Sequence, residues 1–342
     1  MVELIKKLCQ LSGPSGFEEP VRDFIRAAAQ PWADEIRQDA MGNLLVWKRG
    51  ARTPRKPILL AAHMDEVGVL IKSATEQGFL RFRFLGGVDR RVVIGKTVYL
   101  GEQRIPAVVG MKPIHLCDTA SRRQVPKLES LYLDIGASSR EEAERIAPPG
   151  SFGVFADSIT ELSGDMLSVK ALDDRVGCGV MLSILQEPLP VDTWFAFTVC
   201  EEVGCRGAFG AAFSIEPALA LVLEGTTAAD SPVSKDAQKI CSPGRGPVLP
   251  FMDGGTVYDR GLYEQLCTIA EREQIPWQTK TRIAGGTDAQ AIQRTRAGCR
   301  VVAISAAIRY IHSPASVGCT RDFVQMKRLA MSLLREWGKT DV

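Results

Sequence analysis

The chain has 342 residues and a formal net charge of +2, with acidic and basic residues interspersed. Its length exceeds the size at which one hydrophobic core usually stops growing, which favours two domains. The near-neutral charge gives no basis for binding nucleic acid or an anionic membrane, and no apolar run approaches the about 20 residues that a membrane span needs.

The N-terminal segment is predicted to form two helices separated by a turn. Leu4, Leu8 and Leu11 share one helical face, residues 12–16 form the turn, and a second helix begins near Glu18. The first residues carry charges inside a helical pattern and lack a signal-peptide core, which predicts a cytoplasmic protein.

Four short apolar runs each end beside polar groups that can bind a ligand or transfer a proton. The runs cover residues 58–62, 194–200, 218–223 and 301–307, and the groups that follow are His63, Asp65, Glu201, Glu202, Glu224 and His312. Continuous apolar runs are typical of strands that are buried on both faces. Ligands bind outside the carboxyl ends of strands in open α/β sheets, so these groups can converge. Alone, adjacent glutamates are equally typical of a solvated strand end.

The sequence pattern changes after Gly68. Residues 80–84 alternate between apolar and basic side chains, residues 92–100 supply another short strand, and glycines separate these segments. This pattern predicts a small β-barrel or sandwich. Because α/β patterns return near residue 162, we expect an inserted β domain at residues 69–158. Residues 1–68 and 159–342 then form one discontinuous α/β domain.

Two aspartates precede a predicted amphipathic helix. Asp173 and Asp174 stand just before the spaced apolar positions Val176, Val180 and Ile184. A carboxylate is favoured at a helix N-terminus by the free N–H groups and the helix dipole. Capping therefore accounts for one aspartate and leaves the other free for chemistry. Residues 285–289, Gly-Gly-Thr-Asp-Ala, begin a later helix and lie near the site or belong to it.

The chain has nine cysteines and three histidines, and they differ in how strongly they indicate a functional site. The cysteines are odd in number and form no C-x-x-C pair, which is typical of reduced, mostly buried residues. Cys200 and Cys205 flank the glutamate pair and either pack there, react or attract metal. His115 lies in the β region, where it is a loop or core residue or lies at the edge of the site.

Two imidazoles and three carboxylates suit a pair of borderline divalent cations such as Zn²⁺ or Co²⁺ better than Ca²⁺. The five candidate ligands are His63, Asp173, Glu202, Glu224 and His312. A carboxylate that bridges two cations leaves each with one histidine and one further carboxylate. Such a pair lowers the pKa of a water and polarises a carbonyl group. Glu201 is the expected proton shuttle, and Asp65 is expected to accept the second imidazole N–H of His63.

These residues resemble the glutamyl or tetrahedral aminopeptidases, a family of dinuclear metallopeptidases also called cellulase M. The resemblance runs nearly end to end through short motifs at residues 12–19, 62–68, 171–177, 201–208, 285–289 and 310–314. It implies that His63 and Glu224 hold one metal and that Glu202 and His312 hold the other. Asp173 then bridges the two metals, and Glu201 is the general base.

The resemblance also implies a fold and an assembly. The expected fold is phosphorylase/hydrolase-like α/β, a mixed sheet flanked by helices with an inserted small β-barrel. In the family this insertion mediates assembly into a homo-oligomer, often a hollow dodecamer that admits peptides. Two positions depart from the family pattern, because Glu224 replaces the usual Asp and Asp174 replaces the usual Asn.

The expected function is therefore removal of N-terminal residues from peptides by a metal-dependent aminopeptidase. A metal-dependent deacylase of N-acyl amino acids would use the same chemistry. An endoglucanase is indicated only by the cellulase name, and its usual pair of metal-free carboxylates leaves the two histidines unexplained. A non-catalytic scaffold is supported only by the unusual Glu224.

Overall fold

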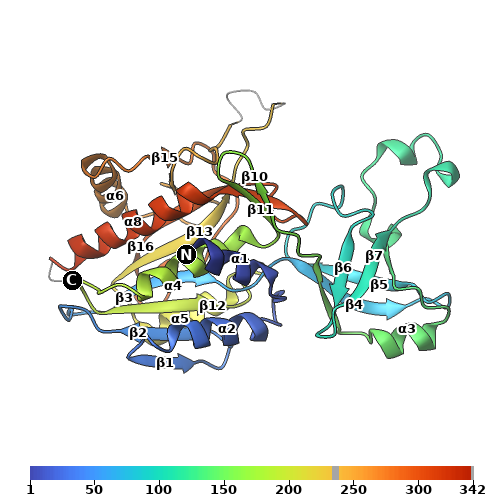
Figure 1. Ribbon diagram of the computed structural model, residues 1–342, viewed down its shortest axis with the longest axis horizontal. Helices are drawn as coiled ribbons and strands as arrows, with labels where there is room; N and C mark the ends of the chain where they lie inside the picture. Colours follow the sequence, from blue (N-terminus) through green and yellow to red (C-terminus); the bar gives the residue numbers. More distant parts are fainter. Residues whose placement is uncertain (233–238, 340–342) are drawn as a thin grey trace.

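The computed structural model describes residues 1–232 and 239–339. A β-barrel projects from one side of an α/β body, and the first and last helices, α1 and α8, belong to the body (Figure 1). The helices are α1 (Val2–Gln10), α2 (Glu19–Ala29), α3 (Arg140–Ile146), α4 (Leu172–Leu185), α5 (Arg206–Ile215), α6 (Arg260–Arg272), α7 (Ala289–Gln293) and α8 (Thr320–Trp337). No helix in the described part of the chain is long and apolar enough to cross a membrane.

The body contains a mixed sheet whose central strands are parallel. Its main path is β1 (Glu35–Gln38), β2 (Leu44–Lys48), β12 (Thr193–Thr198), β3 (Ile58–His63), β13 (Leu219–Thr227), β16 (Arg300–Arg309), β17 (Ser316–Cys319), β11 (Met166–Val169) and β10 (Thr160–Leu162). Strands β12, β3, β13 and β16 are parallel, and the strands on either side pair antiparallel. The short strand β14 (Val248–Leu249) pairs with β16, and β15 (Gln278–Thr279) pairs with β14. The predicted mixed α/β sheet is confirmed.

Each face of the central strands has its own helical layer. On β13, Leu219, Leu221 and Leu223 belong to the core that includes residues of α1, α4 and α8. Ala220 and Val222 on the same strand belong to the core that includes residues of α5 and α7. Successive side chains on a strand point to opposite faces, so the continuous apolar run fills both layers. The strand ends, rather than the strand faces, are left to carry polar groups.

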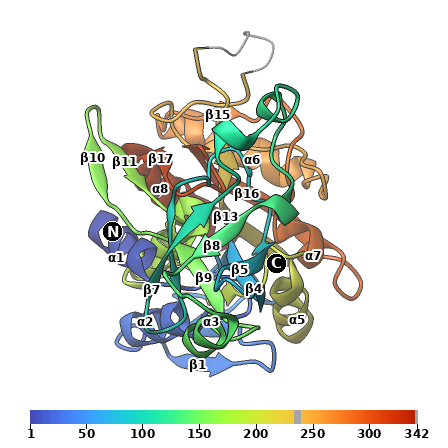
Figure 2. The ribbon, with the colours of Figure 1, turned by 90° about the vertical axis from the view of Figure 1, so that its right-hand side faces the viewer.

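The inserted region forms a closed barrel with a separate hydrophobic core. Its order is β4 (Gly68–Ala74), β5 (Leu80–Leu85), β8 (Tyr132–Asp134), β7 (Ile105–Gly110), β6 (Thr97–Leu100) and β9 (Phe152–Phe155). The alternation on β5 places Leu80 and Phe82 inside, whereas Arg83 is exposed. Figure 2 shows the barrel in front of the body. The predicted barrel is confirmed.

Three local predictions differ from the structure. The strand expected at residues 92–100 covers only β6, because a turn at Gly95 with φ of +74° precedes it. The N-terminal helical pattern predicts helix as far as about Arg37, but α2 ends at Ala29 and residues Glu35–Gln38 form the edge strand β1. Glu224 lies within β13 rather than beyond it, because β13 stays paired with β16 as far as Thr227.

Candidate metal centre

The predicted site residues gather at the carboxyl ends of the parallel strands. His63 is the last residue of β3, and Glu202 follows β12 by a few residues. Glu224 lies in the last part of β13, and His312 comes just after β16. Asp173 lies at the start of α4 and completes the cluster.

Asp173 lies between the two histidines. Its Oδ1 is 3.4 Å from Nε2 of His63, and its Oδ2 is 3.2 Å from Nε2 of His312. Each imidazole also faces a second carboxylate. Oε1 of Glu224 is 3.3 Å from Nε2 of His63, and Oε2 of Glu202 is 3.2 Å from Nε2 of His312. The five predicted ligands therefore lie together as two histidine–carboxylate pairs around one central aspartate.

Both imidazole rings are oriented by backbone carbonyl groups. Nδ1 of His63 lies 3.1 Å from the carbonyl oxygen of Asp65, and Nδ1 of His312 lies 3.1 Å from that of Gly87. A carbonyl oxygen only accepts, so each ring carries its N–H on Nδ1. Nε2 of each ring is then available as a ligand, an arrangement that outer hydrogen bonds produce at metal sites.

The cluster has the properties of a cation site. Asp173 Oδ1, Glu202 Oε1 and Glu224 Oε2 are buried and accept no hydrogen bond. Unsatisfied buried carboxylate oxygens are costly, and a divalent cation would satisfy them. Mixed imidazole and carboxylate donors match the preference of Zn²⁺ and Co²⁺. These residues therefore fit a pair of divalent cations.

The electrostatics of the cluster reflect this excess of negative charge. Burial raises the pKa of Glu224 and of Glu202 well above the usual value, and nearby aspartates add to the shift. Burial favours neutral His312, but Asp173 and Glu202 outweigh it and raise its pKa to about 9. A bound cation would replace these protons, since a metal binds neutral imidazole and ionised carboxylate.

Glu201 faces the same cluster without belonging to either pair. Its Oε2 lies 3.9 Å from Nε2 of His63, and its Oε1 accepts a hydrogen bond from Cys205 Sγ at 3.2 Å. Burial raises the pKa of Glu201, and the charges of Asp173 and Asp65 raise it further against the opposing effect of His63. A carboxylate with a raised pKa beside a reacting group is suited to proton transfer near neutral pH.

Asp65 holds the glutamate pair in place. Its Oδ1 accepts from the backbone N–H of Glu201 at 3.0 Å, and its Oδ2 accepts from that of Glu202 at 3.1 Å. Ser15 Oγ also donates to Oδ2, at 2.6 Å. The expected contact with His63 exists at 3.4 Å, but the shorter contact to that ring comes from the Asp65 carbonyl.

Asp173 and Asp174, at the start of α4, have different roles. Both have non-helical backbone angles, and Asp174 Oδ1 accepts from the N–H of Gly177 at 2.9 Å. Asp174 thus satisfies a free donor of the first turn of α4. Asp173 makes no such capping bond and faces the two histidines. The sequence rule that one aspartate caps and one stays free matches this geometry.

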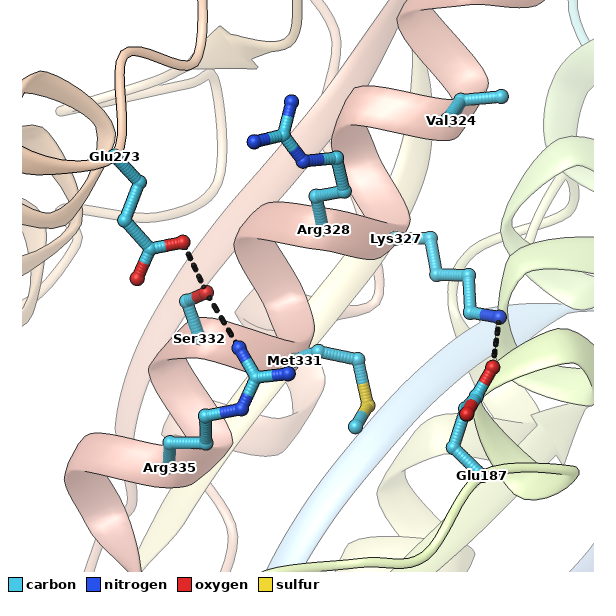
Figure 3. A pocket seen from close by; sticks show the side chains of 8 residues that line it. All are labelled: Glu187, Glu273, Val324, Lys327, Arg328, Met331, Ser332 and Arg335. Atoms are coloured by element: carbon cyan, nitrogen blue, oxygen red, sulfur yellow. Dashed lines mark hydrogen bonds and ion pairs between the residues drawn. The ribbon is translucent and has the colours of Figure 1, made fainter.

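Two other features lie away from the cluster. His115 is exposed in a short 3₁₀ helix, Ile114–Leu116, in the barrel region. A groove of about 520 Å³ lies along α8 and is lined by Glu187, Glu273, Val324, Lys327, Arg328, Met331, Ser332 and Arg335 (Figure 3). Glu187 follows the C-terminal end of α4, roughly 20 Å along that helix from Asp173. The groove therefore contains none of the predicted site residues.

Several contacts at the site were not predicted from the sequence. Ser15 was assigned only to a turn, and the Gly87 carbonyl belongs to the barrel. Asp288, in the Gly-Gly-Thr-Asp-Ala motif, is fully buried and accepts from Thr198 Oγ1. The motif itself could have indicated Asp288. A backbone carbonyl has no signature in the sequence.

Comparisons with known proteins identify a family for this chain, although two structural neighbours at 31% and 29% identity carry the names endoglucanase and putative peptidase/endoglucanase. The model of the M42 glutamyl aminopeptidase family matches residues 42–329. A putative aminopeptidase of Acetivibrio thermocellus is 36% identical over 336 residues, which covers 98% of each chain. The structure of an aminopeptidase from Desulfurococcus kamchatkensis has a TM-score of 0.93 at 36% identity, over 99% of this chain and 96% of that one. The TET1 peptidase of Pyrococcus horikoshii, described as assembling into a tetrahedron or a large octahedral shell, has a TM-score of 0.86 at 34% identity, over 98% of this chain and 99% of that one.

We predict that Asp65→Asn weakens binding of divalent cations by about 10- to 100-fold, the usual cost of losing a partner that orients metal ligands. The amide has one acceptor oxygen fewer, so it cannot hold both glutamate N–H groups. Calorimetric titration with Zn²⁺ measures the change. Asp89→Asn, at a surface pair with Arg91, is the control. Equal affinity of the Asp65 variant and wild type would contradict this role.

Proposed function

Because the chain belongs to the M42 glutamyl aminopeptidase family, we propose that it removes N-terminal residues from peptides with two divalent cations, Zn²⁺ or Co²⁺. The family consists of aminopeptidases, and the chain is a peptidase. The observation that carries the dinuclear proposal is Asp173, whose two oxygens each face a different histidine. A single cation would use only one of these sides.

The ligand sets follow from the two pairs. In this proposal His63 and Glu224 would hold one cation, His312 and Glu202 would hold the other, and Asp173 would serve both. Glu224 is one methylene longer than the family's usual aspartate. Its carboxylate lies 3.3 Å from Nε2 of His63, so the longer side chain reaches the same imidazole nitrogen as Asp173 does.

Bound cations supply Lewis acidity, which lowers the pKa of a water and polarises the carbonyl of the bond to be cleaved. Glu201 then takes the proton from the attacking water on Oε2 and passes it to the leaving amine. Cys205 holds the other oxygen, so the carboxylate keeps its orientation through both transfers. Asp65 fixes the backbone of the same residue.

The rival functions fit the site to different degrees. A deacylase of N-acyl amino acids would use the same groups, and it differs only in what the substrate presents at its N-terminus. An endoglucanase needs two carboxylates free of metal on either side of the sugar bond. Here the carboxylates are paired with imidazoles around one centre. The complete set of donors also argues against a scaffold that has lost its site.

We predict hydrolysis of aminoacyl-p-nitroanilides, with no release of sugar from carboxymethylcellulose. Acylation of the substrate's amine should abolish cleavage if the protein is an aminopeptidase and permit it if the protein is a deacylase. A chelator should stop the reaction, and added Co²⁺ or Zn²⁺ should restore it. Activity that survives complete metal removal would refute the metal-dependent proposal.

We predict that Glu201→Gln lowers kcat by about 10²- to 10⁴-fold, the usual contribution of a general acid–base group. Gln keeps the shape and the hydrogen-bonding ability but loses the basicity, so metal content and KM should stay near wild type. Glu202→Gln is the matched control, and it should lower metal content instead. If Glu201→Gln lost metal while Glu202→Gln kept both cations, the two roles would be reversed.

We propose that this chain also forms a homo-oligomer, as TET1 is described to do, and that the barrel contributes the contacts between its subunits. The support in this chain is a group of exposed apolar side chains on the barrel and its outer loop. They include Val108, Ile114, Leu116 and Val125. A larger assembly would cover them, since such residues on a lone subunit are in contact with water.

We predict that wild type forms an oligomer in light scattering and that the double change Ile114→Asp and Leu116→Asp produces a smaller species. Buried charges would destabilise an apolar contact between subunits. The matched control is Phe209→Asp with Phe213→Asp on α5, since these rings are also exposed. An oligomer that dissociates only in the α5 variant would place the contacts on the body.

A further inference from the structure

Besides the five proposed ligands, two further side chains that could bind a metal lie close to Glu201. Ligand atoms of Glu201, Cys205 and Asp288 all lie within 4.8 Å of one another. Cys205 begins α5, and Asp288 begins α7 on the same face of the sheet. Oε1 of Glu201 contacts the thiol, whereas its Oε2 faces His63. One carboxylate therefore connects two separate groups of donors.

The spacing of these donors suits a small divalent cation. Zn–S and Zn–O bonds of about 2.3 and 2.1 Å place sulfur and oxygen about 3.6 Å apart on a tetrahedral ion. Sγ of Cys205 lies 3.2 Å from Oε1 of Glu201. A shift of a few tenths of an ångström would bring the two atoms to the separation that a shared cation requires.

Asp288 is the second observation that indicates a ligand. Its side chain is 1% exposed, and Oδ1 has no hydrogen-bond partner. The other oxygen accepts from Thr198 Oγ1. Burial, with the charge of Glu201, raises the pKa of Asp288 to about 7. An unsatisfied buried carboxylate oxygen is costly unless a proton or a cation satisfies it.

Cys205 is a thiol in the absence of a cation, because burial and the charges of Asp288 and Glu201 raise its pKa. Nε2 of Gln290 donates a hydrogen bond to Sγ at 3.1 Å, which opposes part of that shift and would stabilise a thiolate bound to a cation. Binding of a cation would displace the S–H proton to solvent and form a metal–sulfur bond. Thiolate is a soft ligand that selects Zn²⁺ or Co²⁺ over Mg²⁺ and Ca²⁺.

The charge balance of the whole centre leaves room for another cation. Seven carboxylates are buried or nearly buried here, and they are Asp65, Asp173, Asp174, Glu201, Glu202, Glu224 and Asp288. Two divalent cations supply only four positive charges. Hydrogen bonds stabilise the charge of Asp65, and protons or a further cation would offset the rest, because unbalanced charge in a buried site is unfavourable.

We infer that Glu201, Cys205 and Asp288 form a third metal site, for a thiophilic divalent cation such as Zn²⁺. The consequence for catalysis rests on the proposed function of Glu201 as the general base. A cation that binds Oε1 of Glu201 withdraws electron density from the carboxylate and so lowers the basicity of Oε2, the oxygen proposed to accept the proton. The enzyme is then activated by the first two equivalents of Zn²⁺ and inhibited by the third.

The test is a Co²⁺ titration of the full-length apoprotein, followed by absorption, in a buffer with a phosphine reductant instead of a dithiol. The five ligands of the dinuclear site offer only nitrogen and oxygen. A sulfur-to-cobalt charge-transfer band in the near ultraviolet therefore reports the third site alone. We expect this band to grow with the third equivalent in wild type and to be lost in Cys205→Ser, which keeps a hydroxyl donor to Glu201. Asp288→Asn should weaken the third equivalent by at least about tenfold, the low end of the cost for a lost metal partner.

Cys200→Ser is the matched control, because Cys200 also flanks the glutamates but its thiol donates to Glu18. It should retain the band and the inhibition by excess Zn²⁺. Saturation of wild type at two equivalents without the band, or a band that persists in Cys205→Ser, would overturn the third site. A band with a third equivalent but no loss of rate would support the site and count against Glu201 as the base.

Discussion

The carboxylate of Asp65 is the contact on which the arrangement of the site depends. It accepts hydrogen bonds from Ser15 and from the backbone N–H groups of Glu201 and Glu202. Three chain segments thus meet at one fully buried group. Burial opposes ionisation of Asp65, but the contacts with His63 and the hydrogen bonds outweigh it and lower its pKa. A buried ionised carboxylate is stable only when hydrogen bonds or opposite charges surround it. The backbone N–H groups of Glu201 and Glu202 must therefore stay within hydrogen-bonding distance of Asp65, which fixes the position of both glutamates.

The sheet supplies the rigidity behind that contact. The carboxyl ends of four parallel strands lie together at one end of the sheet. A hydrophobic core with its layer of helices covers each face of these strands. Glu66, three residues after His63, forms a buried group of ion pairs. Its Oε1 lies 2.7 Å from Nζ of Lys170 and 3.3 Å from the guanidinium group of Arg175. This second ion-pair group joins β11 and α4 to the segment after His63. Asp173, between Lys170 and Arg175 in sequence, is thereby held on both sides.

Much of this site could be predicted because its residues follow continuous apolar runs, which mark buried parallel strands. The runs before His63 and before the glutamate pair located the strand ends, and the spacing after Asp174 located α4. Glu224 was harder to place, because pairing along β13 decides where that strand ends. The backbone oxygens of Asp65 and Gly87 that orient the histidines could not be predicted, since any residue supplies a carbonyl. Nor does a lone cysteine reveal that its thiol will face Glu201.

The hydrogen bond from His312 to Gly87 joins the barrel to the cation centre. Gly86, with φ of +83°, allows the barrel chain to turn there, and a side chain at that position would lie 3.2 Å from Oε2 of Glu202. Whatever moves this turn also moves the acceptor that orients a ligand. Coupling between two binding events is reciprocal in free energy. If contacts between subunits fix the turn, assembly tightens the hold on the cation, and the cation strengthens assembly by the same factor.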